Sequence, residues 1–402
     1  MSYQIKSGVK ISRGVFIILT ICLYSLCATV FTVHYVLQIN SARNQIQILA
    51  AEKNKINNKL SFAQKEYSDL KNQDQYVINQ QLEKDIYNIH TSYASLSASF
   101  EDIADLKAQK QNINKLEDLY VGIVKDLSDL NYASAESKLT SLNEQIKKIN
   151  NDLAAANTTS VANVSATVSN VAPNSGFSYQ LVKTEIGDFT VSIVAADLNS
   201  TRVIVDTASD SDCRDSCPVL SLGDYAGRSG AFAGINGSYF CPASYPSCVG
   251  KTNSFDTLVM NKNKKYFNSD NNVYSTVPVA VFGSGFARFI GRSLDWGRDT
   301  GVDGVIANQP LLLSGGNIAF GGNDDPKQGS RGSRSFVGNK VSTVYIGVVY
   351  NVTVVQAAYV LKALGLENAL NLDSGGSTAL WYGGYKAGPG RNIPNAILFV
   401  RR

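Results

Sequence analysis

The residues of this chain that could do chemistry stand at the ends of short apolar runs in its second half. "NLDSGGSTAL" (371–380) places Asp373 after such a run and follows it with Gly375, Gly376 and Ser377. A carboxylate can serve as a base or a nucleophile, and successive backbone N–H groups at a glycine turn can bind an anion. The stretch therefore predicts either a tight turn or a site where the backbone meets an anionic substrate.

Three further stretches could complete such a site. "GINGSYF" supplies Asn236 and Gly237, "RSFVG" supplies Arg334, and "GRNIPNAILFV" supplies Arg391 before the last predicted strand. Arginine can bind phosphate oxygens through two parallel hydrogen bonds, although each stretch alone also fits a turn or a surface ion pair. Together they predict a site for an oxygen-rich anion. The catalytic candidates are Asp373, Asn236, Arg334 and Arg391, and the substrate-binding candidates are Gly375, Gly376, Ser377 and Gly237.

Histidine is nearly absent, which removes several kinds of active site. The chain has 2 histidines, His34 and His90, and neither lies beyond residue 176. A Ser-His-Asp triad, a Cys-His pair and a histidine-liganded zinc are therefore excluded from the second half. Chemistry there must use carboxylates, Arg, Lys, Tyr, Asn or backbone amides, and no metal site is predicted.

In this order the four stretches resemble the phosphodiester glycosidase family. The family pattern is "iNG-x-F/yF", then "R-T-A-x-G", then "A-x-NLDGGGSt", then an arginine before a terminal strand. The resemblance covers roughly residues 180–402, and "NLDSGGST" is its most specific part. Ser374 replaces the first of three family glycines, and Ser335-Phe336 replace Thr-Ala. These departures leave the charged groups in place and bear on sugar identity.

The resemblance implies hydrolysis of the sugar C1–O bond of a sugar 1-phosphodiester. Asp373 would be the base or nucleophile, Arg334 and Arg391 would bind the phosphate, and Asn236 would donate a hydrogen bond to sugar or phosphate. Because the departing phosphate is already a stable anion, a second carboxyl group that protonates the leaving oxygen is not required. No cofactor is expected, and a divalent cation is left open.

Two other functions fit the same sequence. An anchored protein with a β-rich domain can be a non-catalytic glycan-binding or adhesion protein. A metal-dependent phosphodiesterase would need clustered carboxylates, for which "GGNDDPKQG" offers Asp324 and Asp325. Turnover separates an enzyme from a binding protein, and sensitivity to a chelator separates the two enzymes.

The elements that must position these residues are predicted mainly as strands. Apolar runs rich in β-branched residues span 189–198, 201–208, 277–283, 341–350 and 395–400. One helix is indicated because Thr353 and Gln356 have capping-box spacing and Gly365 supplies a stop. After it, "ENALNL" predicts the strand that leads to Asp373. Residues 177–402 are therefore expected to form an α+β domain with a large mixed β-sheet.

The cysteines of this domain indicate an oxidising compartment. Four cysteines in such a compartment suggest two disulfides, and short spacings favour Cys213–Cys217 and Cys241–Cys248 among three possible connectivities. A four-cysteine zinc site is the alternative, although the spacings are not those of paired zinc knuckles.

The N-terminus reads as a membrane segment. Residues 14–37 are 24 residues without Lys, Arg, Asp or Glu, which is long enough to cross a bilayer core of about 30 Å. Lys6, Lys10 and Arg13 precede the run, and the first acid is Glu52. The positive-inside rule predicts a single pass, with residues 1–40 forming a cytoplasmic tail and signal-anchor and the remainder extracytoplasmic. A cleaved signal peptide is the alternative, but no clear cleavage site follows.

Residues 41–152 have the composition of helical rods. They contain no proline and one glycine, Gly122, and their apolar residues recur every three or four positions. This spacing predicts a coiled coil to about residue 72 and then a small antiparallel bundle with a corner at 127–138. The coiled coil would allow a homo-oligomer.

A change of composition separates these helices from the α+β domain. Residues 153–176 carry no charge and are rich in Ala, Ser, Thr, Val and Asn, which predicts a flexible linker. All 9 prolines and 29 of the 32 glycines lie from Pro173 onward. After residue 175, 20 Lys and Arg nearly balance 17 Asp and Glu. That balance is not the electrostatic footprint of a nucleic-acid-binding domain.

Overall fold

The computed structural model describes residues 13–109, 111–160, 166–323 and 325–402. The chain forms two compact units, residues 1–87 and residues 88–402. The boundary therefore falls inside the second helix, whereas the sequence predicted it between a helical region ending at 152 and a domain beginning at 177. Helices and strands of residues 88–402 belong to one unit because helix α4 (Tyr132–Ser160) contacts strands β13 (Gly332–Lys340) and β14 (Thr343–Val352).

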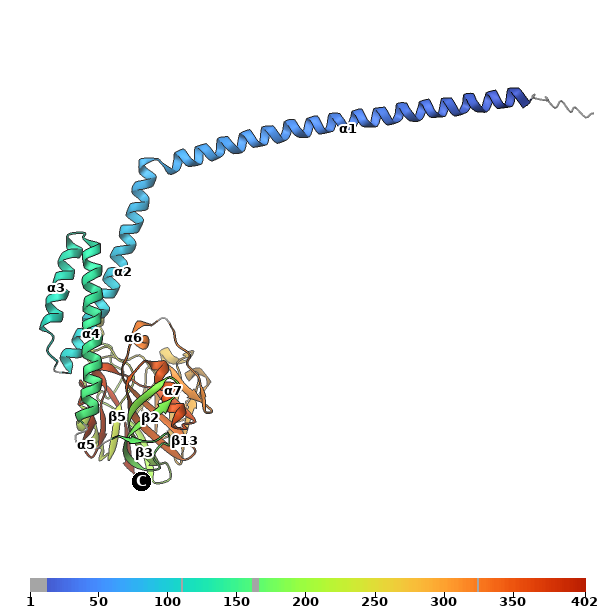
Figure 1. Cartoon of the computed structure of the whole chain (residues 1–402). Helices are drawn as coiled ribbons and strands as arrows, with labels where there is room; N and C mark the ends of the chain where they lie inside the picture. The colour runs from blue at the N-terminus through green and yellow to red at the C-terminus, as the bar shows by residue number, and fades with distance from the viewer. Residues whose placement is uncertain (1–12, 110, 161–165, 324) are drawn as a thin grey trace, which may run out of the picture. The chain divides into compact units, whose positions relative to one another are not determined.

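The first unit is dominated by helix α1 (Arg13–Lys71), a single unbroken helix in Figure 1. It is long and apolar enough to cross a membrane, which fits either a signal-anchor or a signal sequence. It ends near residue 72, where the predicted coiled coil ends. The apolar positions of the predicted seam, among them Ile56, Leu60 and Leu70, are exposed. Coiled-coil pairing with another copy thus stays a prediction.

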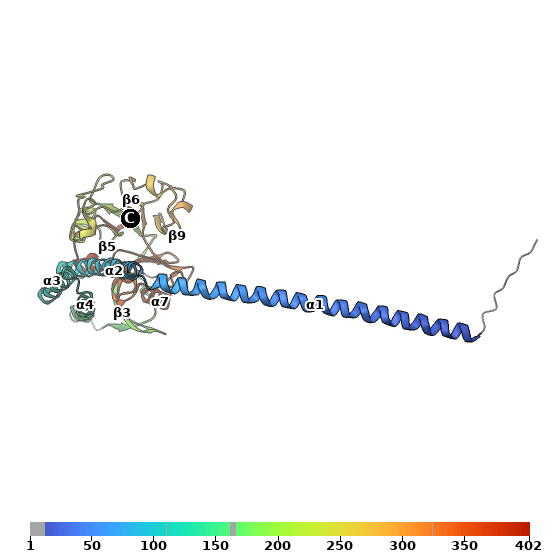
Figure 2. The ribbon, with the colours of Figure 1, turned by 90° about the horizontal axis from the view of Figure 1, so that it is seen from above.

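The second unit begins within helix α2 (Asp74–Ala108), which packs with α3 (Asn114–Ser128) and α4 as a small bundle. Helices α3 and α4 lie side by side (Figure 1 and Figure 2), and residues 129–131 form the corner expected at 127–138. The repeating apolar residues supply the bundle core, as the sequence predicted. The buried members are Leu96, Ile103, Leu106, Ile113, Leu116, Ile123, Ala135, Leu142 and Ile146.

The predicted linker is largely structured. Helix α4 continues to Ser160, eight residues beyond the expected end at 152, and strand β1 (Thr167–Val168) pairs in parallel with β2 (Gly176–Thr184). Ala172 is buried against the domain. A run of Ala, Ser and Thr lacks charge but does not oppose a helix, so composition alone placed the end of this helix too early. Residues 161–165 of the predicted linker lie outside the described residues.

The expected α+β domain is confirmed, and its largest sheet has eight strands. Their order is β1-β2-β3-β14-β13-β15-β11-β12, and the sheet is mixed because β1 pairs in parallel while the other pairs are antiparallel. The strands not yet bounded are β3 (Gly187–Asp197), β11 (Leu311–Ser314), β12 (Asn317–Ile318) and β15 (Asn368–Asn371).

Two five-stranded sheets accompany it, in the orders β7-β6-β10-β8-β9 and β17-β16-β5-β18-β4. The first contains β6 (Val259–Met260), β7 (Tyr266–Phe267), β8 (Val279–Gly283), β9 (Phe286–Ile290) and β10 (Gly304–Ala307). The second contains β4 (Thr201–Thr207), β5 (Ala233–Asn236), β16 (Leu380–Tyr382), β17 (Tyr385–Ala387) and β18 (Asn395–Arg401). The helices of this domain are α5 (Leu222–Ser229), α6 (Pro326–Gly329) and α7 (Val354–Ala363), with short 3-10 turns at Pro246–Cys248, Asp270–Asn272, Ser293–Asp295 and Gly375–Ser377.

The eight-stranded sheet is buried on both faces. One face shares a core with strands of both smaller sheets, and α7 packs on the other face. Burial on both faces explains why β3 and β14 read as continuous apolar runs without strict alternation. Helix α7 begins at the predicted capping box of Thr353 and Gln356, and Gly365 follows its end with a positive φ of +78°.

The two predicted disulfides are confirmed. Cys213 pairs with Cys217 and Cys241 pairs with Cys248. The second disulfide closes a loop that carries Tyr245 and Ser247, and both side chains contact helix α2. The cysteines of helix α1, Cys22 and Cys27, are exposed and unpaired.

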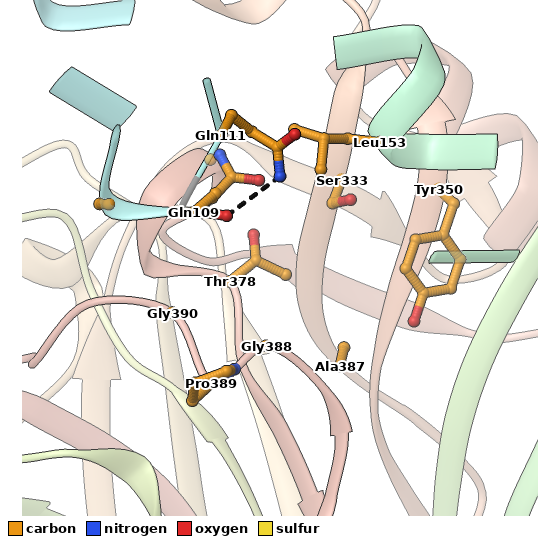
Figure 3. A pocket seen from close by; sticks show the side chains of 12 residues that line it. Gln109, Gln111, Leu153, Ser333, Tyr350, Thr378, Ala387, Gly388, Pro389 and Gly390 are labelled. Atoms are coloured by element: carbon orange, nitrogen blue, oxygen red, sulfur yellow. Dashed lines mark hydrogen bonds between the residues drawn. The ribbon is translucent and has the colours of Figure 1, made fainter. Parts of the chain in front are cut away.

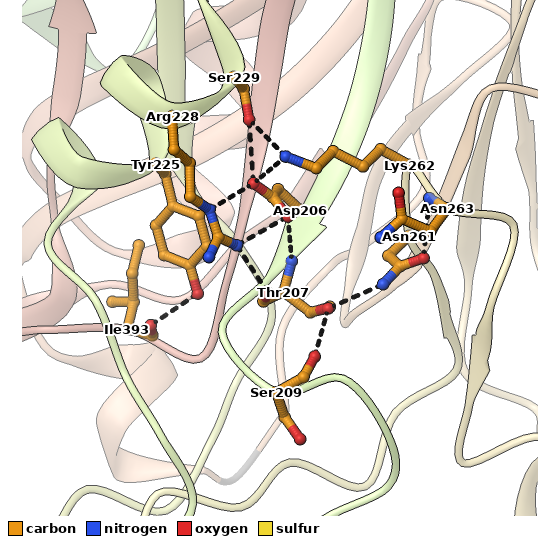
Figure 4. A network of polar contacts seen from close by, with 10 residues as sticks. All are labelled: Asp206, Thr207, Ser209, Tyr225, Arg228, Ser229, Asn261, Lys262, Asn263 and Ile393. Atoms are coloured by element: carbon orange, nitrogen blue, oxygen red, sulfur yellow. Dashed lines mark hydrogen bonds and ion pairs between the residues drawn. The ribbon is translucent and has the colours of Figure 1, made fainter.

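A buried ionic network holds the edge strand β4 to its neighbours (Figure 4). Asp206 is 2% exposed and accepts hydrogen bonds from Arg228, Ser229 and Lys262. Burial alone would raise the pKa of Asp206, but the hydrogen bonds from Arg228 and Lys262 outweigh it and lower that pKa. A lowered carboxyl pKa stabilises the folded state at pH values above the ordinary carboxyl pKa, and this stability is lost as the pH falls through the folded-state pKa.

We expect Asp206→Asn to lower the free energy of unfolding by about 3 kcal/mol, at the lower end for a broken buried pair because both cations remain partly exposed. Chemical denaturation of the full chain, followed by near-UV circular dichroism, measures this. Asp295→Asn, which removes the exposed pair with Arg292, is the matched control and should cost less than about 1 kcal/mol. Equal effects would mean that the network contributes no special stability.

Candidate active site

The four predicted catalytic residues come from two sheets whose strand ends adjoin. Strand β13 runs antiparallel to β15, with Phe336 opposite Asn371. This register sets the start of β13, with Arg334, beside the end of β15, with Asp373. Asn236 is the last residue of β5, and β5 pairs with β18, whose approach carries Arg391.

Asn236 joins the two sheets. Its side chain is fully buried; Nδ2 donates to the backbone oxygen of Asp373 at 2.6 Å. Its Oδ1 accepts from the Ser335 hydroxyl at 2.9 Å and from the Ala379 N–H at 3.1 Å. The Asp373 N–H in turn donates to the Gly237 oxygen at 3.0 Å. The "ING" and "NLD" motifs therefore hold each other, and Asn236 is placed to position the Asp373 backbone.

Asp373 presents its carboxylate to a pocket while its main chain stays fixed. Oδ1 accepts the Ser374 N–H at 2.9 Å, and the hydroxyl of Ser377 also hydrogen-bonds the carboxylate. Burial raises the pKa of Asp373 to about 7, against the lowering effects of these two bonds and of the Lys327 charge. A base whose pKa is near neutral is well matched to proton abstraction at neutral pH.

The serine that departs from the family glycine pattern fits its position. Ser374 has an extended backbone, with φ of −141° and ψ of −167°, so no glycine is required there. Its hydroxyl accepts from the Ser335 N–H and donates to the Leu372 oxygen, each at 3.2 Å. The two departures from the family pattern, at 374 and 335, thus contact each other and lock the end of β15 to β13.

The next two residues need to be glycine, for different reasons. Gly375 has φ of +63°, in the left-handed region that favours glycine. Gly376 lies against the guanidinium of Arg391, and a Cβ there would collide with Nη2 and stand 2.9 Å from Nε. The Arg391 N–H donates to the Gly376 oxygen at 2.8 Å. The turn therefore places the Gly376 N–H next to the guanidinium of Arg391.

We expect Gly376→Val to lower both stability and activity, because the added side chain must displace Arg391. Overpacking of this kind typically costs about 1–3 kcal/mol. The melting temperature and the phosphate affinity should fall together. Gly384→Val is a control with a different origin of strain, because its φ of +140° is unfavourable but nothing lies within 4 Å. Unchanged phosphate affinity in Gly376→Val would mean that Arg391 does not need its present position.

Arg391 is buried beside this turn. Its guanidinium lies 5.2 Å from the centre of the Tyr245 ring, and burial lowers its pKa to about 10. Nη2 forms an ion pair with Asp105 of helix α2. Nε and Nη1 have no hydrogen-bond acceptor among the residues that the structure describes. The arginine thus retains donors that a larger anion could use.

Arg334 is held mainly by backbone oxygens. Nη2 donates to the oxygens of Lys327 and Ser330 at 2.8 and 2.6 Å, and Nε donates to the Val352 oxygen at 3.3 Å. The side chain still lines the pocket with Asp373. Burial lowers the pKa of Arg334, and the nearby Tyr239 opposes that effect.

The pocket over Asp373 has a volume of about 360 Å³. Asp373, Arg334 and Gly375 line it from the α+β domain, and Asp102 and Asp105 line it from helix α2. A second pocket of about 240 Å³ adjoins it and shares Gly375 (Figure 3). In Figure 3 the side chains of Gln109 and Gln111, after α2, face the loop at 388–390 across this second pocket. The helical bundle therefore forms part of the wall of both pockets.

The other predicted substrate contacts divide by position. Gly375 lines both pockets, and the Gly376 N–H points to Asp105 at 3.4 Å. Ser377 is buried and bonds Asp373. Gly237 packs against β18, where a Cβ would collide with the Asn395 side chain. The geometry thus brings Gly375 to the pockets, directs the Gly376 N–H to a residue of the pocket wall, and gives Ser377 and Gly237 supporting contacts.

The sequence analysis missed the residues that helix α2 brings to the site. Glu101, Asp102 and Asp105 occupy polar positions of a helix with a regular apolar seam, and nothing in that pattern marks them. Tyr245 and Lys327 were also missed, although Tyr245 lies inside the disulfide loop. Within the described ranges no group of three or more His, Cys, Asp or Glu side chains is arranged to hold a metal. Asp324, named for the phosphodiesterase alternative, lies outside those ranges.

Comparison with known proteins agrees with the resemblance drawn from the motifs. A sequence model of the phosphodiester glycosidase family matches residues 229–400, which include all four catalytic candidates. None of the curated proteins matches the chain significantly.

Solved structures give remote matches. A hypothetical protein from Synechocystis is 14% identical with a TM-score of 0.44, over 56% of this chain and 62% of that one. The catalytic domain of zebrafish N-acetylglucosamine-1-phosphodiester alpha-N-acetylglucosaminidase, auto-inhibited by its pro-peptide, is 16% identical with a TM-score of 0.44. That match covers 60% of this chain and 87% of that domain.

Proposed function

Because residues 229–400 match the sequence model of the phosphodiester glycosidase family, we propose that this chain is a hydrolase that cleaves the sugar C1–O bond of sugar 1-phosphodiesters. The observation that carries the proposal is the pairing of a buried carboxylate, Asp373, with an adjacent glycine turn that packs against the Arg391 guanidinium. The carboxylate can act at the sugar carbon, and the turn with its arginine can bind the phosphate. Such a pair is what this reaction requires.

The reaction needs little acid catalysis. A phosphate diester oxygen leaves C1 as part of a stable anion, so the protein must chiefly bind the charge that collects there. Arg391 offers Nε and Nη1, which have no acceptor among the described residues. The Gly376 N–H adds a backbone donor on the same side. Arg334 adds positive charge at the pocket wall.

Asp373 acts on the other side of the bond. As a base it takes a proton from water while the water oxygen bonds to C1. The C1–O bond breaks, and its electron pair goes to the phosphate oxygen. The products are a free sugar and a phosphate monoester, and the proton passes from Asp373 to solvent. As a nucleophile, the same carboxylate would first form a glycosyl ester that water then cleaves. Asn236 positions Asp373 in both versions through its backbone oxygen.

Labelled water tests the bond that is cleaved. The full chain in detergent is incubated with a methyl phosphodiester of sugar C1 in H₂¹⁸O. Cleavage of C1–O puts the label in the sugar, as either version of the mechanism requires. Label in the phosphate would instead identify a phosphodiesterase that cuts P–O, and a chelator arm would then test its metal. Binding without turnover would leave a glycan-binding protein.

We also propose that the domain faces outward from a membrane and acts on envelope or extracellular glycans. Lys6, Lys10 and Arg13 before the apolar run and the two disulfides support this orientation. Protease added to intact cells should release the α+β domain. Protection that lasts until the cells are lysed would reverse the orientation.

The pH dependence of activity should follow Asp373. Its raised pKa, about 7, means that the carboxylate is protonated in more acid solution and cannot act. We expect kcat/KM to fall about tenfold for each pH unit below that pKa and to level off above it. Stability should move the opposite way: the contribution of this raised pKa is complete below the ordinary carboxyl pKa and is lost as pH rises through about 7. A kcat/KM that is flat through this range would exclude Asp373 as the titrating base.

A further inference from the structure

Helix α2 places a carboxylate where the substrate phosphate is proposed to bind. Asp105 forms an ion pair with Arg391 and accepts a hydrogen bond from the Tyr245 hydroxyl at 2.8 Å. Its second oxygen lies 3.4 Å from the Gly376 N–H. The arginine, the tyrosine and the glycine turn therefore already hold an anion, and that anion belongs to the chain itself.

A second carboxylate on the same face occupies a second cationic position. Glu101 lies four residues before Asp105 and pairs with Lys327 and with the Ser247 hydroxyl. The Lys327 ammonium lies 4.7 Å from the centre of the Tyr245 ring, the same ring that Arg391 contacts at 5.2 Å. The lysine and the arginine thus both contact the ring of Tyr245, and each forms an ion pair with one acid of α2.

A third acid lies beside these two and faces the pocket. Burial raises the pKa of Asp102 to about 6, against the lowering effects of Lys327 and Arg334. Burying three carboxylates is costly unless cations compensate them, and a buried ion pair contributes little net stability. The contact of α2 with the pocket is therefore poised for displacement by an anion that fits better.

Phosphate would fit the arginine better than Asp105 does. The side chain of Arg391 is 11% exposed, and its Nε and Nη1 have no acceptor among the described residues. One carboxylate leaves these donors unused, whereas phosphate presents more oxygens to the guanidinium. The position is thus built for a larger anion than the one it holds.

The spacing of Glu101 and Asp105 indicates the length of the ligand. Side chains four apart on a helix are neighbours, with Cβ atoms about 5–6 Å apart. Two anions bound at these positions must therefore be separated by a short bridge. A polyol or a sugar that carries a phosphate at each end meets this requirement, and a lone phosphate does not.

We propose that Lys327 and Ser247 form a second anion subsite next to the Arg391 position, and that the acidic face of α2 (Glu101, Asp102, Asp105) occupies both until a glycan with two closely spaced phosphates displaces it. The inference rests on the proposed function for its first subsite. It makes the ligand a polymer of repeating phosphodiesters across short polyol or sugar units. It also makes α2 a competitor of that ligand.

Binding of two matched probes to the full chain in detergent tests the second subsite. Glycerol 1,3-bisphosphate should bind at least about tenfold more tightly than glycerol 1-phosphate, and Lys327→Ala should remove this difference without weakening the binding of the monophosphate. Equal affinity of the two probes for the wild-type chain would overturn the proposal. So would an equal loss of both probes in Lys327→Ala.

Removal of the acids tests the competition. Glu101→Gln with Asp105→Asn keeps size and should tighten bisphosphate binding about tenfold or more. Glu117→Gln, which removes an exposed acid of the same bundle that pairs with Lys107, is the control and should change nothing. If the double variant does not fold, Glu101→Gln alone carries the test, because Lys327 is 45% exposed and tolerates the loss of its partner. Unchanged or weaker bisphosphate binding would overturn the proposal.

Hydrogen exchange supplies an independent readout. The bisphosphate should increase deuterium uptake over the last turns of α2, near residues 98–108, because the helix leaves the pocket; unchanged or lower uptake would contradict displacement. These measurements do not depend on turnover. Bisphosphate binding that displaces α2 without any sugar release would uphold the subsite and overturn the proposed reaction. Sugar release with no preference for two phosphates would do the reverse.

Discussion

Asp373→Asn is expected to lower the turnover of a sugar 1-phosphodiester by about 10³-fold, in the range that a lost general base produces, while the protein stays folded. The substitution keeps the size of the side chain and an oxygen that can accept the Ser374 N–H. The contacts that fix the main chain, from Asn236 and to Gly237, do not involve the carboxylate. Catalysis should therefore fail without loss of structure.

Stability separates this outcome from a purely structural role. Burial raises the pKa of Asp373 to about 7, so above that pH the ionised form opposes folding. Asparagine removes that charge, and the melting temperature at about pH 8 should stay level or rise. If Asp373 only capped a tight turn, the same variant would lose stability and retain turnover.

A matched control exists at the end of another strand. Asp197 closes β3 and accepts the Asn199 N–H at 3.1 Å without facing the pocket. Asp197→Asn should leave turnover at the wild-type level. Melting temperature and turnover are measured on the same samples of both variants. A well-folded Asp373→Asn protein with full activity would end the catalytic assignment.

Much of the α+β domain could be predicted because its signals are local. Helix α7 follows from a capping box that the structure reproduces at Thr353 and Gln356, and the strand before Asp373 follows from a short apolar run. The grouping of the site needed more than local pattern. Strand β13 lies beside β15 because the two pair in one sheet. The apolar pattern of a strand does not reveal which strand it pairs with. The family resemblance supplied the grouping.

The contribution of the helical bundle could not be predicted from its sequence. Leu96 and Ile103 mark the buried face of α2 correctly. Glu101 and Asp105 lie on polar positions, where a regular amphipathic helix gives no reason to expect a partner. Their basic partners are more than two hundred residues away in the sequence. The predicted flexible linker also suggested that the bundle and the α+β domain were separate, so no contact between them was expected.

Arg391→Lys is expected to lower kcat/KM by about 10²-fold, the lower part of the range for loss of one donor to a developing negative charge. Lysine keeps the charge but loses the planar group that can bind two phosphate oxygens at once. The site gives little room for compensation, since Gly376 lies against the guanidinium and the Tyr245 ring lies near it. The shorter reach of the ammonium cannot replace Nε and Nη1 together.

The loss in Arg391→Lys should divide unevenly between kcat and KM. The phosphate gains charge as the C1–O bond breaks, so a group that binds it acts more strongly on the transition state than on the bound substrate. Both kcat and KM should change, with the larger change in kcat. Arg288→Lys, at an arginine that contacts the Phe286 ring in strand β9, is the control and should leave both constants unchanged. If Arg391→Lys raises KM and leaves kcat intact, Arg391 binds the substrate evenly along the reaction, and the leaving phosphate must be stabilised by another group.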